Sequence, residues 1–323
     1  MTMQHLDASA LASLLPPGDL VGALREGFRA GCVLPVRHHH TLPKRDEADA
    51  MLLLMPAWTA EEDRADGGYL GVKVSTVFPG NGARGLGAVQ GSYVLSSART
   101  GQALATLDGL ELTLRRTAAA SALAASFLAR EDAARLLVVG TGNLAPHLAR
   151  AHCAVRPIRR IEVWGRDAAK ASAVADRLRA AGLDARARTE LEVAVGEADV
   201  ISCATLSHEP LVRGEWLRPG THLDLVGAFT PRMRESDDDA VRGAEVFVDT
   251  REGAAAEAGD LLRAIETGAF AWERLRADLF DLCRGEHPGR RDAAEITLFK
   301  SVGTALEDLF AAILAWERGR GAT

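Results

Sequence analysis

Strand-like and helix-like segments alternate through the second half of the chain. Apolar runs at 136–140, 158–164, 198–204, 221–226 and 245–249 are separated by segments with apolar residues at helical spacing, such as 168–181. Short buried strands that alternate with helices are typical of a parallel sheet covered by helices on both faces. The pattern therefore predicts an α/β fold, a doubly wound parallel sheet of the Rossmann type.

The first half of the chain has a different pattern. A helix is expected after Pro16 and Pro17, and short β-like segments follow, separated by Gly, Pro and Asp turns. These segments lie at 34–40, 50–55, 69–78, 92–96, 103–108 and 111–114, with a turn at 108–109 joining the last two. They predict an antiparallel or mixed sheet in an α+β domain.

An alanine-rich helical stretch at 117–130 marks the expected boundary between the two domains. We therefore assign residues 1–116 to the first domain and 117–299 to the second. Residues 293–318 carry apolar side chains at helical spacing, which predicts a long amphipathic terminal helix. We expect its latter part, 300–323, to return to the first domain.

The composition narrows the compartment and the partners. Of the 323 residues 47% are hydrophobic and 25% charged, and the net charge is −6, which argues against a nucleic-acid partner. The longest apolar-looking run, 118–129, is too short to span a bilayer, and no basic-then-apolar leader opens the sequence. No Cys-x-x-Cys pair is present, so neither zinc nor a disulfide framework is indicated. We expect a cytoplasmic protein without a membrane partner.

A glycine-containing turn follows the first apolar run of the second half. The run at 136–139 ends at Gly140-Thr141-Gly142, a helical pattern opens near Asn143 and Leu144, and a second strand follows at 161–164. Glycines at such a turn let backbone approach a bulky anion, and the helix N-terminus favours negative charge. A plain strand-to-helix turn is the alternative, but this βαβ context favours binding of a dinucleotide pyrophosphate.

The end of the second strand bears on which dinucleotide is used. NAD-selective Rossmann folds place an acidic residue there for the ribose 2′-hydroxyl, whereas NADP-selective ones place an arginine for the 2′-phosphate. Here Gly165 is followed by Arg166 and then Asp167. A guanidinium gains a bidentate contact with a phosphate, and the neighbouring carboxylate works against it. We therefore predict NADPH as the preferred cofactor, with NADH usable.

Three cations in the first domain stand in apolar, strand-like surroundings. Arg37 follows Leu-Pro-Val, Lys73 interrupts a run rich in β-formers, and Arg116 follows the segment 111–114. A buried cation needs an anionic partner, from the protein or from a ligand. No run of acidic residues lies nearby, so a substrate carboxylate is one candidate, and solvent-facing side chains on edge strands are the alternative.

Several short segments carry a resemblance that extends over nearly the whole chain. They are 70–73, 100–101, 108–109, 114–119, 140–143, 226–228, 234–237 and 295–301. In order and spacing they resemble the ornithine cyclodeaminase/mu-crystallin family. The resemblance implies a homodimer whose N-terminal domain binds substrate and mediates dimerisation, beside a Rossmann domain.

The resemblance also implies roles for individual residues. Arg37, Lys73 and Arg116 match the cations that bind the substrate carboxylate, and His39 is a candidate hydrogen-bond partner of the substrate. Thr117 is expected by the cofactor or the substrate, and the cofactor set also includes Ala204, Thr205, Val226 and Gly227. No metal is implied, and successive histidines at 38–40 would point to opposite faces of a strand.

Two departures argue against the founding reaction of the family. Ornithine cyclodeaminases carry an acidic residue where this chain has Phe229, and a glutamate where it has Leu53. Expulsion of ammonia needs proton transfer at nitrogen, which apolar side chains cannot supply. The segment 226–235 resembles instead the branch that reduces cyclic imino acids.

The sequence thus predicts an NAD(P)H-dependent reductase of the CH–NH class, acting on a small cyclic imino acid. Its substrates would be Δ1-pyrroline-2-carboxylate and Δ1-piperideine-2-carboxylate, and its products L-proline and L-pipecolate. Lys73, or a water held near it, is the candidate proton donor, since desolvation beside other cations lowers a lysine's pKa. The alternatives are an alanine-type amino-acid dehydrogenase, an ornithine cyclodeaminase and a mu-crystallin-like ligand-binding protein.

Overall fold

The computed structural model describes residues 3–59 and 67–321. The chain divides into two compact units. The first unit comprises Met1–Arg116 and Thr304–Thr323, and the second comprises Thr117–Gly303.

The second unit contains a parallel sheet in the strand order β13-β12-β14-β11-β10-β7-β8-β9. Its strands are β7 (Arg135–Val139), β8 (Arg160–Trp164), β9 (Ala185–Arg188), β10 (Val200–Cys203), β11 (His222–Leu225), β12 (Glu245–Val248), β13 (Leu275–Asp278) and β14 (Thr297–Lys300). From β7 the chain adds β8 and β9 on one side, and then β10 and β11 on the other. The strand order therefore reverses between β7 and β10, which is where such sheets bind ligands.

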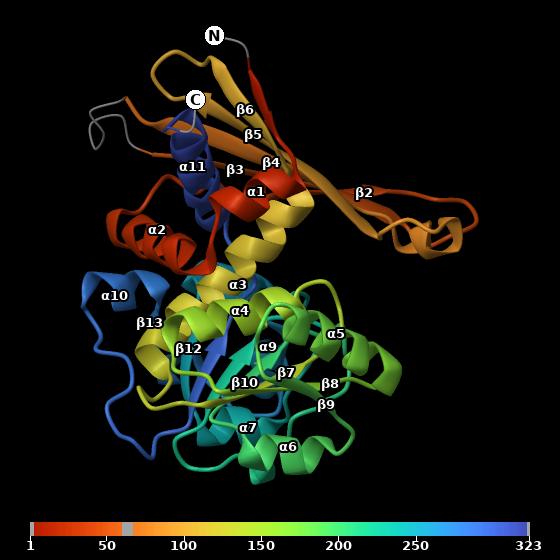
Figure 1. The fold of residues 1–323 in the computed structure, drawn as a ribbon, viewed down its shortest axis with the longest axis vertical. Coiled ribbons are helices and arrows are strands. Elements are labelled where there is room, and N and C mark those ends of the chain that lie inside the picture. Colours follow the sequence, from red (N-terminus) through yellow and green to blue (C-terminus); the bar gives the residue numbers. More distant parts are fainter. Residues whose placement is uncertain (1–2, 60–66, 322–323) are drawn as a thin grey trace. The chain divides into compact units, whose positions relative to one another are not determined.

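Helices cover both faces of this sheet, as Figure 1 shows for α4 and α5 on one side and α6 and α7 on the other. Alternate residues of β7 supply two separate cores: Leu136 and Val138 pack toward α4 and α5, and Leu137 and Val139 toward α6 and α7. This double burial explains the uninterrupted apolar strands of the sequence. The helices are α4 (Ala145–Val155), α5 (Ala168–Ala180), α6 (Leu191–Glu197), α7 (Asp238–Gly243), α8 (Arg251–Glu257), α9 (Gly259–Glu266) and α10 (Leu279–Arg284), with short 3₁₀ turns at Gly214–Trp216 and Trp272–Arg274. The predicted fold class is confirmed.

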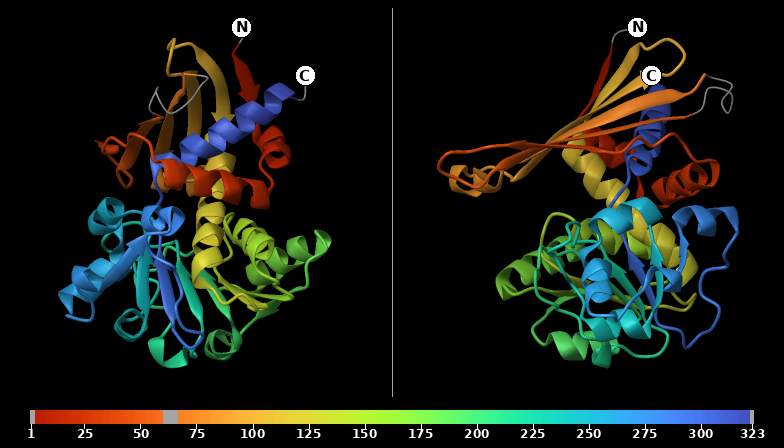
Figure 2. Two further views of the ribbon diagram at one scale, coloured as in Figure 1. Left: turned by 90° about the vertical axis from the view of Figure 1, so that its left-hand side faces the viewer. Right: turned by 180° about the vertical axis from the view of Figure 1, so that it is seen from behind.

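The first unit is built on a sheet in the order β1-β6-β5-β4-β3-β2, antiparallel except for the β1–β6 pair. Its strands are β1 (Gln4–Leu6), β2 (His38–Leu42), β3 (Ala50–Trp58), β4 (Tyr69–Val77), β5 (Val89–Ser97) and β6 (Ala103–Asp108). Helix α11 (Ala305–Gly321) lies against β3, β4 and β5, and α2 (Pro17–Ala30) packs on α11 (Figure 2). Helix α1 (Ala8–Leu14) and a 3₁₀ turn at Pro79–Arg84 complete the unit.

The expected strand at 111–114 is wrong, because these residues belong to helix α3 (Gly109–Leu128). The alternating Glu-Leu-Thr-Leu sequence suggested a strand, but the carboxylate of Asp108 accepts a hydrogen bond from the backbone N–H of Glu111 at 2.7 Å. That bond satisfies a free donor at the helix start, and the alanines that follow propagate the helix.

The single long helix expected over 293–318 is also wrong. Residues Thr297–Lys300 form β14, which lies between β11 and β12, and α11 begins only at Ala305. In a segment of four residues, this spacing of apolar side chains is compatible with a helix or with a strand. The neighbouring strands β11 and β12 favour the strand, because β14 pairs with the backbone groups of both and is itself fully buried.

Candidate functional site

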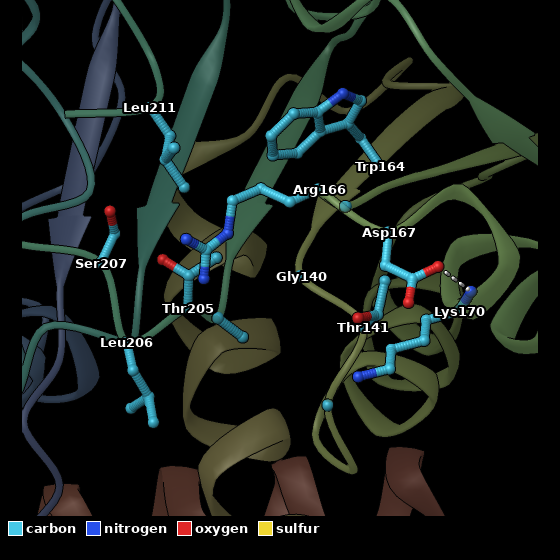
Figure 3. A pocket seen from close by; sticks show the side chains of 13 residues that line it. Gly140, Thr141, Trp164, Arg166, Asp167, Lys170, Thr205, Leu206, Ser207 and Leu211 are labelled. Carbon is cyan, nitrogen blue, oxygen red and sulfur yellow. Dashed lines mark hydrogen bonds between the residues drawn. The ribbon is translucent and has the colours of Figure 1, made fainter. Parts of the chain in front are cut away.

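A pocket of about 310 Å³ opens in the second unit at the carboxyl ends of β7, β8 and β10. Its position is the point where the strand order reverses. Six of the residues that we predicted to contact a cofactor line it (Figure 3): Gly140, Thr141, Gly142, Arg166, Ala204 and Thr205. The other predicted cofactor residues, Thr117, Asn143, Leu144, Val226 and Gly227, are absent from the lining.

Gly140 makes the first turn of this pocket possible. Its φ of 134° lies in the region that favours glycine, and a Cβ atom there would meet the carbonyl oxygen of Ala204 at 2.5 Å. The backbone amide of Gly140 donates to the carbonyl of Trp164 at 2.9 Å, which ties the turn to the end of β8. Asn143 and Leu144 complete the turn before α4 begins at Ala145.

Arg166 and Asp167 leave the end of β8 in different directions. In Figure 3 the Arg166 side chain points into the pocket, while the Asp167 carboxylate faces the start of α5. That carboxylate caps the helix, accepting hydrogen bonds from the backbone N–H groups of Ala169 at 2.9 Å and Lys170 at 3.2 Å. The acidic group that weakened our cofactor prediction is therefore engaged by the helix terminus.

Besides Asp167, which the sequence analysis had weighed beside Arg166, the lining includes residues outside the predicted cofactor set: Trp164, Gly165, Lys170, Leu206, Ser207 and Leu211. Lys170 could have been found, because it lies in the first turn of α5, four residues after Arg166. Leu211 carries no local signal. It reaches the pocket because its backbone amide donates to the carbonyl of Glu235 at 2.9 Å, a contact between distant segments.

The first unit brings two of the predicted substrate cations together. Lys73 on β4 and Arg116 on α3 are both buried, and both contact the carboxylate of Asp308 on α11. The Lys73 Nζ–Asp308 Oδ2 distance is 2.7 Å, and the Arg116 Nε–Asp308 Oδ1 distance is 3.0 Å. Arg116 Nη1 also lies 2.6 Å from a carboxylate oxygen of Glu307.

Protein carboxylates therefore pair with both cations, although no run of acidic residues lies near either one in the sequence. The acids come from the first turn of α11, far along the chain, so no inspection of neighbouring sequence could find them. Arg116 retains a hydrogen-bond donor beyond these ion pairs. A guanidinium has several N–H donors, and Nη2 of Arg116 makes no hydrogen bond among the residues that the structure describes.

Burial changes the acid–base behaviour of this cluster. Desolvation, together with the neighbouring Arg116, lowers the pKa of Lys73 to about 8, although Asp308 opposes the shift. Tyr93 pairs with Lys73 across β4 and β5, and burial raises the pKa of its phenol. A lysine with a pKa of about 8 can exchange a proton near neutral pH.

Two further predicted substrate residues, Arg37 and His39, lie just before β2 and on β2 of the first unit's sheet. Arg37 precedes β2, half-buried, and its charge helps to lower the Lys73 pKa. His39 pairs with Leu53, and Lys73 with Met55, so the two lie on one face because Leu53 and Met55 are two residues apart. Burial, followed by the charge of Arg37, lowers the His39 pKa.

Among residues 3–59 and 67–321, no group of three or more His, Cys, Asp or Glu side chains is arranged to hold a metal ion. Within the same ranges, no helix has both the length and the apolar character needed to cross a membrane.

The fold and the pocket define a two-unit protein with a Rossmann sheet and a separate, mostly antiparallel sheet. The family model of the ornithine cyclodeaminase/mu-crystallin family matches residues 10–322, and the chain belongs to that family. The resemblance noted in the sequence is thereby confirmed.

The similarity to individual relatives extends over almost the full length of this chain. The chain is 40% identical to a Δ1-pyrroline-2-carboxylate reductase of Paracoccus denitrificans, covering 94% of this chain and 96% of that protein. The Thermococcus litoralis Δ1-pyrroline-2-carboxylate reductase in complex with NADH and L-proline is 31% identical, with a TM-score of 0.91 over 99% of this chain and 98% of that one. An archaeal alanine dehydrogenase dimer with bound NAD is 27% identical, with a TM-score of 0.89 over 100% and 97% of the two chains.

Proposed function

We propose that this protein reduces Δ1-pyrroline-2-carboxylate to L-proline with a nicotinamide dinucleotide, and Δ1-piperideine-2-carboxylate to L-pipecolate. The observation that carries the proposal is the pocket at the reversal of the strand order, with Gly140, Gly142 and Arg166 in its lining. Relatives named for the same reduction, one of them solved with NADH and L-proline, support it.

NADPH is the proposed preferred cofactor, with NADH usable. The turn at 140–142 and the start of α4 would hold the pyrophosphate, because backbone N–H groups and the helix dipole favour an anion there. Arg166 would contact the ribose 2′-phosphate, and the capping role of Asp167 removes an obstacle to that phosphate. Thr117, Ala204, Thr205, Val226 and Gly227 would complete the site.

The proposed roles in catalysis fall to the buried cluster of the first unit. When bound, the reduced nicotinamide supplies the hydride that is added to C2 of the C=N bond. Arg116 and Arg37 would hold the substrate carboxylate, with a hydrogen bond from His39, and so orient C2. Lys73 would donate the proton to the ring nitrogen, a role that suits a pKa of about 8.

The apolar residues at two positions make the cyclodeaminase reaction the weaker candidate. Phe229, at 43% exposed, follows β11 in the second unit, and Leu53 lies half-buried on β3. Neither side chain can take up a proton from an amine. The proposed substrate needs no such step, because its nitrogen stays in the ring throughout the reduction.

We also propose that the protein is a homodimer formed through the first unit. The face of its sheet opposite α11 exposes large apolar side chains: Trp58 at 39%, Leu70 at 37% and Val74 at 37%. Trp58 pairs with Leu70 and Leu54 with Val74, so these residues share one face. An exposed apolar surface of this kind marks an interaction site, and the dimeric alanine dehydrogenase neighbour is consistent with it.

The test is a set of parallel assays on the purified protein, following loss or gain of reduced nicotinamide. Δ1-Pyrroline-2-carboxylate and Δ1-piperideine-2-carboxylate are each supplied with NADPH or NADH, and pyruvate with ammonia and NADH is the dehydrogenase arm. Turnover of a cyclic imine with L-proline or L-pipecolate as product supports the proposal. Turnover of pyruvate alone would indicate the amino-acid dehydrogenase instead. Dinucleotide binding without any turnover would indicate the ligand-binding protein.

A further inference from the structure

Glu235 is a fully buried carboxylate that follows the loop after β11 in the second unit. One of its oxygens, Oε1, accepts hydrogen bonds from the backbone N–H of Thr205 at 2.6 Å and from the Thr205 hydroxyl at 2.9 Å. The other, Oε2, accepts from the backbone N–H of Gly227 at 2.7 Å. One side chain therefore joins the loop after β10 to the loop after β11.

The backbone of Glu235 is itself held in place. Its N–H donates to Asp260 Oδ1 at 2.8 Å, and its carbonyl accepts from the N–H groups of Leu211 at 2.9 Å and Val212 at 3.0 Å. Leu211 and Thr205 both line the pocket described above. Glu235 thus anchors the loop 204–211 at both ends, although it is absent from the pocket lining.

The two joined loops pack without spare room. A Cβ atom added to Gly227 would lie 2.0 Å from the carbonyl oxygen of Thr205 and 2.5 Å from Oε1 of Glu235. A small change in the length or orientation of the Glu235 side chain must therefore move one loop relative to the other.

The charges around Glu235 do not balance. Lys300 of β14 lies 3.4 Å from Asp260 Oδ2, and its ammonium donates to the carbonyl of Leu225 at 3.2 Å. Two buried carboxylates, Glu235 and Asp260 of α9, thus share one buried ammonium, with the Cys203 thiol of β10 nearby. Burial is the main cause that raises the pKa of Glu235 to about 7, with Lys300 opposing and Asp260 reinforcing the shift.

We propose that Glu235 is a positioning residue of the dinucleotide site, which sets the spacing of the loops 204–211 and 226–227 by accepting hydrogen bonds from both. The inference rests on the proposed function, because it assumes that the pocket binds a nicotinamide dinucleotide. Each carboxylate oxygen serves a different loop, so the role requires an acceptor on both oxygens.

The variant that tests this is Glu235→Gln, in the full-length protein. Glutamine keeps the size of the side chain but replaces one acceptor by an N–H₂ donor, which must then face a backbone N–H of Thr205 or Gly227. The expected result is a Kd for NADH that rises about tenfold or more, or about 1.4 kcal/mol. The measurement is titration of nicotinamide fluorescence, well below the unfolding temperature of each variant.

A matched control is available in the same sheet, at the amino-terminal ends of β7 and β10, whereas the pocket lies at their carboxyl ends. Asp199 accepts hydrogen bonds from the backbone N–H groups of Ala134 at 2.9 Å and Arg135 at 3.0 Å, and pairs with Arg130 at 3.1 Å. Asp199→Asn makes the same chemical change between two chain segments that lie away from the pocket. It should lower Tm and leave the Kd for NADH unchanged.

A pH titration of the unmodified protein tests the same idea without any variant. Protonation turns one acceptor oxygen of Glu235 into a donor, so affinity for NADH should fall about tenfold between about pH 8 and about pH 6. NADH is the probe because the 2′-phosphate of NADPH itself titrates in this range. The Glu235→Gln protein should show no such dependence.

The outcomes separate the inference from the function on which it rests. Equal NADH affinity of Glu235→Gln and the unmodified protein, or an equal loss of affinity in Asp199→Asn, would overturn the positioning role. If the unmodified protein binds neither NADH nor NADPH at any pH, the proposed function fails instead.

Discussion

The Lys73–Asp308 pair offers a direct test of the proposed chemistry. Asp308 lies 2.7 Å from the Lys73 ammonium and stabilises its protonated form, while burial and Arg116 act against it. Asp308→Asn removes the stabilising charge with almost no change in shape. Arg116 keeps its contact with Glu307 at 2.6 Å, so we expect the variant to fold.

The expected size of the effect of Asp308→Asn follows from the pKa of Lys73. With a value of about 8, roughly half of the Lys73 side chains carry the proton at pH 8. A nearby opposite charge shifts a pKa by roughly 1–3 units, so its loss should lower the Lys73 value by at least about one unit. The protonated fraction then falls about fivefold at about pH 8 and about tenfold at about pH 9, and hardly changes at about pH 6.

The assay is kcat/KM for imine reduction by the unmodified protein and by Asp308→Asn, across about pH 6 to about pH 9. The substrate nitrogen titrates identically in both series, so the ratio of the two proteins at each pH removes its contribution. The kcat/KM of the unmodified protein divided by that of Asp308→Asn should be near one at acidic pH and should grow as pH rises. Lys73→Met should lose on the order of 2–4 kcal/mol in kcat/KM at every pH.

A constant ratio across the whole range would refute the reasoning. It would mean that Asp308 supports binding or folding without setting the proton affinity of Lys73. An Asp308→Asn protein more active than the unmodified one at alkaline pH would contradict the sign of the electrostatic argument.

Three further predictions concern the cofactor, the substrate and the assembly. Arg166→Ala should raise KM for NADPH by about tenfold and leave KM for NADH nearly unchanged. Asp167→Asn still caps α5, so it should not raise KM for NADPH. Equal effects of Arg166→Ala on the two KM values would contradict the proposed preference for NADPH. L-Ornithine with NAD should yield no ammonia, measured by a coupled ammonia assay, because Phe229 cannot transfer protons; steady ammonia release would restore the cyclodeaminase reaction. Val74→Glu should give a monomer by light scattering, whereas Val193→Glu, at a similarly exposed site on α6, should leave the dimer intact. A Val74→Glu protein that remains a dimer would place the interface elsewhere.

Local sequence was enough for the pocket's framework. Gly140 was identified because only glycine suits a strand that turns sharply beside another backbone, and the structure gives it a φ of 134°. Arg166 was predicted because the end of the second strand lies near the ribose in Rossmann folds, and the structure places Arg166 in the pocket lining. In both cases the decisive interactions lie within a few residues of the chain or follow from the fold class.

Segments that suit two secondary structures could not be assigned from the chain alone. Residues 297–300 have apolar spacing compatible with a helix, and only the edges of β11 and β12 make them a strand. Residues 111–114 alternate like a strand, and the cap from Asp108 makes them helical. Propensity over four residues is too weak to outweigh such contacts.

By itself, then, the sequence determined what depends on local spacing: the parallel α/β alternation and the glycine turn. It left open whether Lys73 and Arg116 are buried or face solvent, and the structure buries both. The tertiary structure decided which distant groups meet. Asp308 reaches Arg116 across 192 positions of the chain, and Glu235 reaches Thr205 across 30. Such pairings are fixed by the packing of helices and strands against one another, and burial there strengthens charge interactions that a sequence pattern cannot place.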